Sequence, residues 1–271
     1  MSIKEQIEKY GVTPNKALGQ NFLINEEAIF SIVSAARAEN KNVLEIGAGL
    51  GAITHGLNER AKKTLVVEID KAMVDALYSM PWSHPENLRI LRADFLNVSD
   101  DVIRDELGDD FCVVANLPYY VTTPICMKLL TCGFDIESMT LMMQTEAAQR
   151  FTAKPCSKLY TPLAVLTDSQ YTVSSVLSTS PSDYYPQPEV YSKVIRLERK
   201  ERDLSQVKPL ARVLKAAFSM RRKTLQNNIM TLGFDKNKAA ELLKRADIAC
   251  ERRAETLTTD EFLRLTHVVA E

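Results

Sequence analysis

The sequence predicts an α/β protein, with a doubly wound, mixed seven-stranded sheet followed by a small all-helical domain at the C-terminus. Three observations favour this fold. Runs rich in β-formers alternate with helical segments between residues 41 and 197, a glycine-rich turn follows the first run, and no strand pattern occurs beyond Pro209. With 271 residues and 45% hydrophobic content, the chain can bury one substantial core and still carry a small second domain.

Short apolar and β-branched runs mark the expected strands. The first five are spaced for the helical crossovers that join parallel strands. The last two follow each other without room for a helix, which predicts an antiparallel hairpin at the edge of the sheet. The seven expected strands are residues 42–46, 64–69, 88–92, 111–115, 138–143, 170–176 and 190–197.

The character of the chain changes near residue 200. Residues 198–209 are charged and end on a proline, and apolar residues then recur at helical spacing, as in Leu210, Val213 and Leu214. We therefore expect an α/β domain over residues 1–200 and a domain of three or four helices over residues 201–271.

The composition restricts the class of protein. No uninterrupted apolar run reaches the roughly 18 residues of a membrane span, and the first ten residues lack an apolar leader core, so we expect a soluble, cytoplasmic protein. The five cysteines are scattered without a C-x-x-C pair, and the three histidines lack metal-type spacing. We expect neither disulfides nor a metal site.

The formal net charge of −1 argues mildly against a nucleic-acid partner, because phosphate-binding proteins usually carry a basic surplus. Total charge hides its distribution, however, and one face could still be basic. Bases gather in two groups, which are Lys193, Arg196, Arg199, Lys200 and Arg202, and then Arg212, Lys215, Arg221, Arg222 and Lys223.

A glycine-rich turn, residues 47–51, follows the first strand and includes Gly47 and Gly49. Glycines let the backbone approach a ligand closely, although several classes of nucleotide-binding fold share such a turn. Glu68 ends the next strand, where an acid can accept hydrogen bonds from ribose hydroxyls, as it also would for NAD. Asp94, after the third strand, can accept from an adenine amino group. Either acid alone is commonly a solvated strand-end residue.

The fourth strand delivers the sequence Asn116-Leu117-Pro118-Tyr119 to the carboxyl edge of the sheet, where ligands bind in open α/β folds. The N6 lone pair of adenine is delocalised into its ring, so acceptors must hold the amino hydrogens before the nitrogen can attack. The Asn116 side chain and the carbonyl of Leu117 or Pro118 can be those acceptors. Proline stiffens the turn, and Tyr119 offers a face for a flipped base. The alternative is a proline turn with a buried tyrosine.

At these residues the chain resembles the ribosomal RNA adenine dimethyltransferase family, most closely its bacterial small-subunit branch. The resemblance spans essentially the whole chain, and it includes residues 18–23, 144–150, 185–190 and 218–225. It implies a Rossmann-like class I methyltransferase fold with S-adenosyl-L-methionine as cofactor. It also implies transfer of four methyl groups in total to two adjacent adenosines, in a hairpin near the 3′ end of 16S rRNA on an immature small subunit. We expect a monomer without a membrane partner.

The motifs and the resemblance together predict the site residues. The target adenine is expected at Asn116, Pro118, Tyr119 and Tyr184, the last of which replaces the phenylalanine usual in the family. We hypothesise that Arg221, Arg222 and Lys223 hold rRNA phosphates, the alternative being a solvated helix face. Cofactor binding is expected at Asn21, Leu23, Gly47, Gly49, Glu68, Asp94 and Asn116.

Residues 1–200 are accordingly expected to bind S-adenosylmethionine and catalyse the transfer, and residues 201–271 to bind rRNA. Two other functions stay open. One is methylation of 23S rRNA by the related resistance methyltransferases. The other is a ribosome-assembly factor that has lost catalysis, against which the intact Asn116 and Tyr119 argue.

Overall fold

The protein is described by a computed structural model over residues 3–15, 18–82, 86–201 and 203–271. The chain forms two compact units. The first, which we call the α/β unit, comprises Met1–Ile125, Gly133–Ala148 and Val173–Arg199, and the second, the helical unit, comprises Cys126–Cys132, Gln149–Thr172 and Lys200–Glu271.

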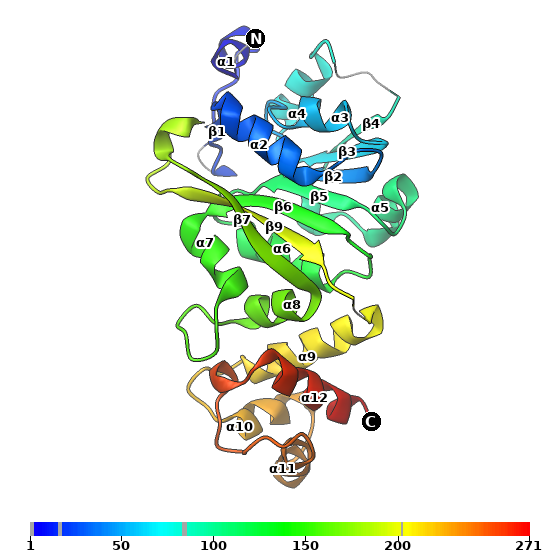
Figure 1. Ribbon diagram of the computed structural model, residues 1–271, viewed down its shortest axis with the longest axis vertical. Coiled ribbons are helices and arrows are strands. Elements are labelled where there is room, and N and C mark those ends of the chain that lie inside the picture. The colour runs from blue at the N-terminus through cyan, green and yellow to red at the C-terminus, as the bar shows by residue number, and fades with distance from the viewer. Residues whose placement is uncertain (1–2, 16–17, 83–85, 202) are drawn as a thin grey trace. The chain divides into compact units, whose positions relative to one another are not determined.

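A seven-stranded sheet with the order β4-β3-β2-β5-β6-β9-β7 organises the α/β unit (Figure 1). Strands β4, β3, β2, β5 and β6 are parallel, whereas β9 pairs antiparallel with β6. The mixed seven-stranded sheet expected from the sequence is confirmed, and the last two strands are neighbours at its edge. The strands are β2 (Asn42–Ile46), β3 (Lys63–Glu68), β4 (Leu88–Arg92), β5 (Cys112–Asn116), β6 (Ser138–Gln144), β7 (Tyr171–Thr179) and β9 (Ser192–Arg199).

Continuous apolar runs form the central strands because helices pack on the sheet and exclude water from it. One core cluster joins α2 and α3 to alternate residues of the strands, among them Val43, Val114 and Val194. The helices of this unit are α1 (Ile3–Lys9), α2 (Glu26–Ala36), α3 (Thr54–Asn58), α4 (Lys71–Tyr78) and α5 (Asp100–Leu107), while α6 (Thr122–Thr131) and α7 (Thr145–Gln149) run across the division between the units.

A second, two-stranded sheet was not predicted. Strand β1 (Phe22–Leu23) pairs antiparallel with β8 (Tyr184–Tyr185), with Leu23 opposite Tyr184. The ladder is extended by Ile24, whose N–H donates to the Asp183 carbonyl at 2.8 Å. This pairing brings the N-terminal segment against a loop that lies more than 150 residues further along the chain.

The helical unit contains α8 (Pro162–Gln170), α9 (Val207–Ala217), α10 (Leu225–Ile229), α11 (Lys236–Arg245) and α12 (Thr259–Ala270). It is larger than residues 201–271, because the segment before α8 packs into it. The Tyr160 ring lies 6.2 Å from that of Phe218, and its hydroxyl donates to the Leu257 carbonyl at 2.8 Å. The division of function expected at residue 200 stays a prediction.

The first group of bases does not form a free basic face, because two of its members are engaged within the protein. Arg196 is buried and donates to the Ala36 carbonyl at 3.1 Å. Arg199 forms an ion pair with Asp135 at 2.7 Å. Strand β9 uses these cations to hold its neighbours, whereas Arg202 lies outside the described residues.

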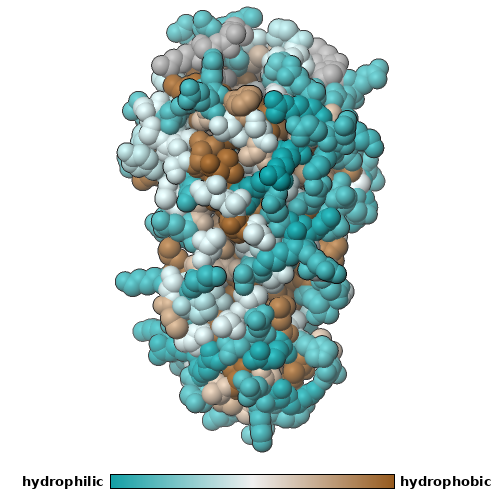
Figure 2. Space-filling model, in the orientation of Figure 1, coloured by the Kyte–Doolittle hydropathy of each residue, from teal (hydrophilic) through white to brown (hydrophobic). Residues whose placement is uncertain are grey.

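The face drawn in Figure 2 is mostly hydrophilic, with apolar residues in smaller groups. Over the described ranges, no helix combines the length and apolar character needed to cross a membrane. In the same part of the chain, no three His, Cys, Asp or Glu side chains gather as metal ligands would. Of the five cysteines, only Cys156 is exposed.

Candidate active site

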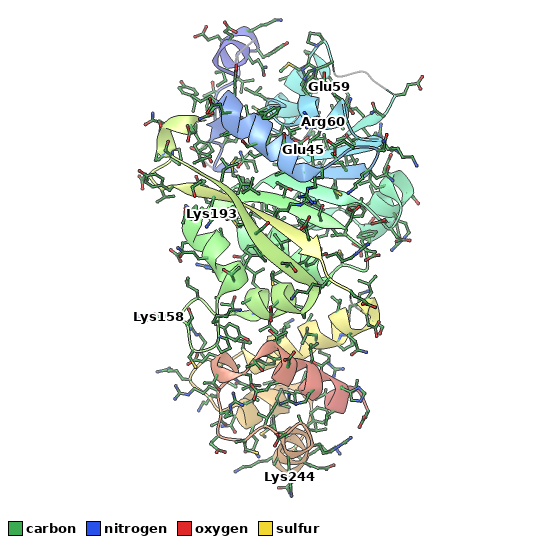
Figure 3. The ribbon with its side chains drawn as sticks, viewed as in Figure 1. Glu45, Glu59, Arg60, Lys158, Lys193 and Lys244 are labelled. Atoms are coloured by element: carbon green, nitrogen blue, oxygen red, sulfur yellow. The ribbon has the colours of Figure 1, made fainter. Side chains whose placement is uncertain are left out.

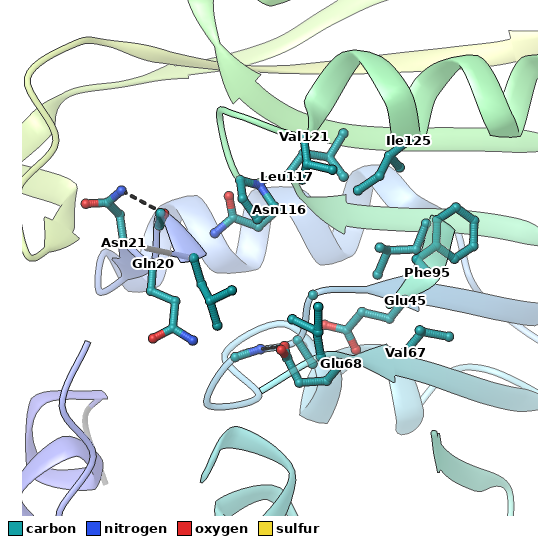
Figure 4. A pocket seen from close by; sticks show the side chains of 18 of the residues that line it. Gln20, Asn21, Glu45, Val67, Glu68, Phe95, Asn116, Leu117, Val121 and Ile125 are labelled. Atoms are coloured by element: carbon teal, nitrogen blue, oxygen red, sulfur yellow. Dashed lines mark hydrogen bonds between the residues drawn. The ribbon is translucent and has the colours of Figure 1, made fainter. Parts of the chain in front are cut away.

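The carboxyl ends of β2, β3 and β5 open into a pocket of about 280 Å³ in the α/β unit (Figure 4). The structure brings all the residues predicted for cofactor and adenine into the lining of this one pocket. They are Asn21, Leu23, Gly47, Gly49, Glu68, Asp94, Asn116, Pro118, Tyr119 and Tyr184. Because they come from six separate parts of the chain, the fold itself assembles the site.

The glycine-rich turn approaches two other segments closely. Gly47 and Gly49 have φ angles of +75° and +56°, in the left-handed region that side chains disfavour. A Cβ atom on Gly49 would lie 3.2 Å from the ring of Phe22, and one on Gly47 would lie 3.5 Å from the carbonyl of Asn116. The turn is therefore held between the N-terminal segment and the end of β5.

Glu68 holds the same turn from the end of β3. Its carboxylate accepts hydrogen bonds from the N–H of Gly49 at 2.9 Å and from the N–H of Asp70 at 3.0 Å. Burial raises the pKa of Glu68, and these backbone N–H groups oppose the rise. A carboxylate offers about four acceptor positions, so two remain for the hydroxyls of a ligand.

Asp94 and Asn21 are partly occupied within the protein. Asp94 caps the short 3₁₀-helix that follows β4, because its Oδ1 accepts from the N–H of Leu96 at 2.9 Å. The amide of Asn21 donates to the Gly19 carbonyl at 3.1 Å. These bonds fix both side chains at the edge of the pocket, and each keeps further acceptor capacity.

Hydrogen bonds of its own backbone anchor the turn after β5. The N–H of Leu117 donates to the Met142 carbonyl at 2.9 Å. The carbonyl of Pro118 accepts from the Thr122 hydroxyl at 2.9 Å and from the N–H of Val121 at 3.2 Å. With both of its lone pairs engaged, the Pro118 carbonyl is a poor acceptor for an adenine, which favours the Leu117 carbonyl of the two considered.

Two tyrosine rings face the pocket, and their hydroxyls are bonded within the protein. The Tyr119 hydroxyl lies 3.0 Å from Ser192 Oγ. Tyr184 is only 2% exposed, and its hydroxyl lies 2.6 Å from Thr179 Oγ1. Burial raises the pKa of both phenols, so both stay neutral near pH 7.

Glu45 is a site residue that the sequence reasoning missed. It lines the pocket from β2, is 2% exposed, and lies inside the α/β unit (Figure 3). Burial, aided by the nearby Glu68 carboxylate, raises its pKa from 4.5 to about 8. The signal was an acid within the apolar run of a buried strand, where ionised groups are costly.

The lining includes three acids, Glu45, Glu68 and Asp94, and its described residues include no Lys, Arg or His. Figure 4 shows Glu45 and Glu68 close together at one end of the pocket. With Glu45 largely neutral near pH 7, the Glu68 and Asp94 side chains suit a ligand that carries positive charge, as the sulfonium and ammonium groups of S-adenosylmethionine do. The residues present therefore fit the cofactor expected from the sequence.

The three basic residues of the RNA hypothesis lie in the helical unit. Arg221, Arg222 and Lys223 are exposed, on the turn between α9 and α10 and not on a helix face. Buried Asn228 anchors this turn, since its amide donates to the carbonyls of Ala217 at 2.5 Å and Met220 at 3.2 Å. No carboxylate in the described part of the chain pairs with the three cations.

Comparisons with known proteins agree with this site. The family described as ribosomal RNA adenine dimethylase matches residues 11–271. Ribosomal RNA small subunit methyltransferase A of Clostridium botulinum (strain Okra) is 37% identical, over 99% of this chain and 98% of the relative. The protein of the same name from Moorella thermoacetica is 38% identical, over 97% of this chain and 95% of the relative.

Two solved structures share the fold. A dimethyladenosine transferase from Plasmodium falciparum has a TM-score of 0.70 and 25% identity, covering 89% of this chain and 94% of that one. The 23S rRNA methyltransferase ErmE has a TM-score of 0.65 and 24% identity, covering 93% of this chain and 100% of that one. At that identity, the second likeness concerns the fold alone.

The mixed sheet, the glycine turn and the acidic pocket agree with the family match and the solved structures, which together identify a class I methyltransferase that uses S-adenosylmethionine. The fold class, enzyme class and cofactor expected from the sequence are thereby confirmed. Within that class, the chain belongs to the ribosomal RNA adenine dimethylase family, as the match over residues 11–271 and the relatives above 30% identity establish.

We expect Gly49→Ala to weaken cofactor binding at least about tenfold, because the methyl group is strained at positive φ and crowds the Phe22 ring. Calorimetric titration with S-adenosylmethionine measures the effect. Gly233→Ala is the control, since Gly233 has a φ of +100° with nothing within 4 Å of the added Cβ. Equal affinities of the two variants would contradict this account of the turn.

Glu45 predicts a pH dependence of stability. Because its folded pKa of about 8 lies above the ordinary 4.5, the neutral carboxyl stabilises the fold fully at low pH, and that contribution is lost as pH rises from 4.5 towards 8. Relative to Glu45→Gln, the wild type should lose roughly 3–5 kcal/mol of unfolding free energy between pH 5 and 9. Urea unfolding of the ligand-free proteins measures it, with Glu59→Gln as an exposed control. A pH-independent difference between wild type and Glu45→Gln would rule the account out.

Proposed function

We propose that this protein dimethylates N6 of two adjacent adenosines in a hairpin near the 3′ end of 16S rRNA, on an immature small ribosomal subunit in the cytoplasm. It acts as a monomer and without a membrane partner. The observation that carries the proposal is the single pocket that joins the cofactor residues to the Asn116–Tyr119 turn. The choice of small-subunit RNA is supported by the names of relatives that match the chain over nearly its full length.

S-adenosylmethionine supplies a methyl group bonded to a positively charged sulfur. On the protein side, the turn at Gly47 and Gly49 lets the backbone approach the ligand, and Glu68 accepts hydrogen bonds from ribose hydroxyls. Asp94 accepts from the adenine amino group of the cofactor, while Asn21 and Leu23 close the pocket from the N-terminal segment. The acidic lining also favours the cationic methyl donor over a neutral product.

The target adenine is bound at the other end of the pocket. The Asn116 side chain and the Leu117 carbonyl accept the two N6 hydrogens, which draws the nitrogen lone pair out of the ring. Pro118 stiffens the turn, and the rings of Tyr119 and Tyr184 provide apolar faces for a base taken out of its stack. No strong general base is required, because positioning supplies most of the rate.

The 23S rRNA alternative was left open by the sequence, and the 23S rRNA methyltransferase ErmE shares the fold. That likeness carries no information on the RNA, whereas the relatives above 30% identity name the small subunit. An assembly factor without catalysis would not need a turn whose Asn116 and Tyr119 both line the cofactor pocket.

Transfer of labelled methyl groups to immature small subunits from a methyltransferase-deficient strain tests the function. Mass mapping should locate two dimethyladenosines in one small-subunit hairpin. Asn116→Ala should lower the rate at least about 100-fold, because the amino group loses an acceptor in the transition state. The exposed Asn227→Ala is the control and should retain wild-type activity. Methylated large-subunit RNA would support the 23S alternative, and binding without transfer would support the assembly factor.

The basic turn in the helical unit supports phosphate binding. Replacing Arg221, Arg222 and Lys223 by alanine should weaken subunit binding and lower the slope of log affinity against log salt by about 2–3, because each phosphate contact releases about one counterion. Salt titrations of binding measure the slope. The control replaces Lys62, Arg92 and Lys244, which changes net charge equally on other exposed sites. If the two triple variants share one salt slope, the turn does not bind phosphate.

A further inference from the structure

Side chains that lie outside the pocket lining anchor the hydroxyls of its two tyrosines. Ser192 Oγ lies 3.0 Å from the Tyr119 hydroxyl. Tyr184 bonds to Thr179 Oγ1 at 2.6 Å, and its hydroxyl donates to Met142 Sδ at 3.2 Å. Burial raises the pKa of Tyr184, and the side-chain hydrogen bond to Thr179 opposes the rise. Ser192 thus anchors the phenol of Tyr119, while Thr179 and Met142 anchor that of Tyr184.

Ser192 itself cannot touch a ligand. It is 1% exposed and does not belong to the pocket lining, whereas both tyrosine rings do. It begins β9, where it pairs with Gln144 at the end of β6. The stiff sheet therefore sets the position of the hydroxyl.

A serine hydroxyl has one hydrogen and two lone pairs, so it can either donate to the Tyr119 phenol or accept from it. A hydrogen bond shielded from water is stronger than an exposed one. A tyrosine ring has few rotatable bonds, and anchoring its hydroxyl fixes the plane of the ring.

We propose that Ser192 is a positioning residue, which fixes the plane of the Tyr119 ring so that it receives the target adenine beside the acceptors of the Asn116 turn. This inference rests on the proposed function. A base that is held within a narrow range of orientations reacts faster. Without its anchor, the Tyr119 ring would still contact the base, but the base would adopt the reactive geometry less often. Loss of the Ser192 hydroxyl should therefore lower turnover and leave cofactor affinity unchanged.

A matched serine exists in the same ladder. Ser138 is also 1% exposed and begins β6, where it pairs with Glu198. Its hydroxyl donates to Cys112 Sγ at 3.4 Å and lies outside the pocket lining. Ser138→Ala thus removes the same atom from the same depth of the sheet without touching either tyrosine.

The test compares Ser192→Ala, Tyr119→Phe, the double variant and Ser138→Ala. We expect Ser192→Ala and Tyr119→Phe each to lower kcat about tenfold, with KM for RNA and calorimetric Kd for S-adenosylmethionine within about twofold of wild type. Both changes break the same hydrogen bond, between Tyr119 and Ser192. The kcat of the double variant should therefore lie no more than about twofold below that of the less active single variant. Ser138→Ala should keep wild-type kcat.

The proposal would be overturned if the fold-losses in kcat of the two single variants multiplied in the double variant. It would also be overturned if Ser192→Ala had the same kcat as Ser138→Ala. If Ser192→Ala does not fold, Tyr119→Phe decides, because it removes the same bond from the pocket side and an unchanged kcat would refute the role of Ser192. The wild-type protein tests the proposed function separately from the role of Ser192. Transfer to large-subunit RNA would refute the proposed function, and the variants would then be compared on that RNA. If the wild type transfers no methyl group at all, both fail together.

Discussion

The pocket depends on one buried carboxylate, that of Glu68. It accepts the N–H groups of Gly49 and Asp70, and so ties the glycine turn after β2 to the turn after β3. Asp70 in turn accepts from the amide of Gln20 at 2.8 Å, which holds the N-terminal segment at the same place. A buried acid is costly unless it is hydrogen-bonded, and here the bonds that satisfy it are the ones that shape the site.

The acidic pocket and the basic turn lie in separate units. The pocket of the α/β unit is lined by Glu68 and Asp94, which suit a cationic methyl donor. The exposed cations of the RNA hypothesis, Arg221 to Lys223, belong to the helical unit. A net charge of −1 is the sum of these distributions, and it therefore says little about the partner of either unit.

The short β1–β8 ladder brings together segments that the sequence analysis treated apart. Leu23 pairs with Tyr184, so the N-terminal motif and the loop before β9 form one wall of the pocket. Ser192, which follows that loop at the start of β9, bonds to Tyr119 and so connects β9 to the Asn116–Tyr119 turn. The geometry at the expected base site is thus set by strand pairing in addition to the motif after β5.

The sequence by itself determined the sheet, because strand runs and turn glycines are local patterns that packing on two faces reinforces. It also predicted that Glu68, Asp94 and Asn116 reach one pocket, since parallel strands end at one edge. Only the tertiary structure decided the extent of the helical unit, the burial of Arg196 and the pairing of Tyr184 with Leu23. It alone showed that Glu45 lines the pocket and that Ser192 bonds to Tyr119. These features depend on contacts between residues far apart in the chain, and no local spacing encodes which distant partner satisfies a buried polar group.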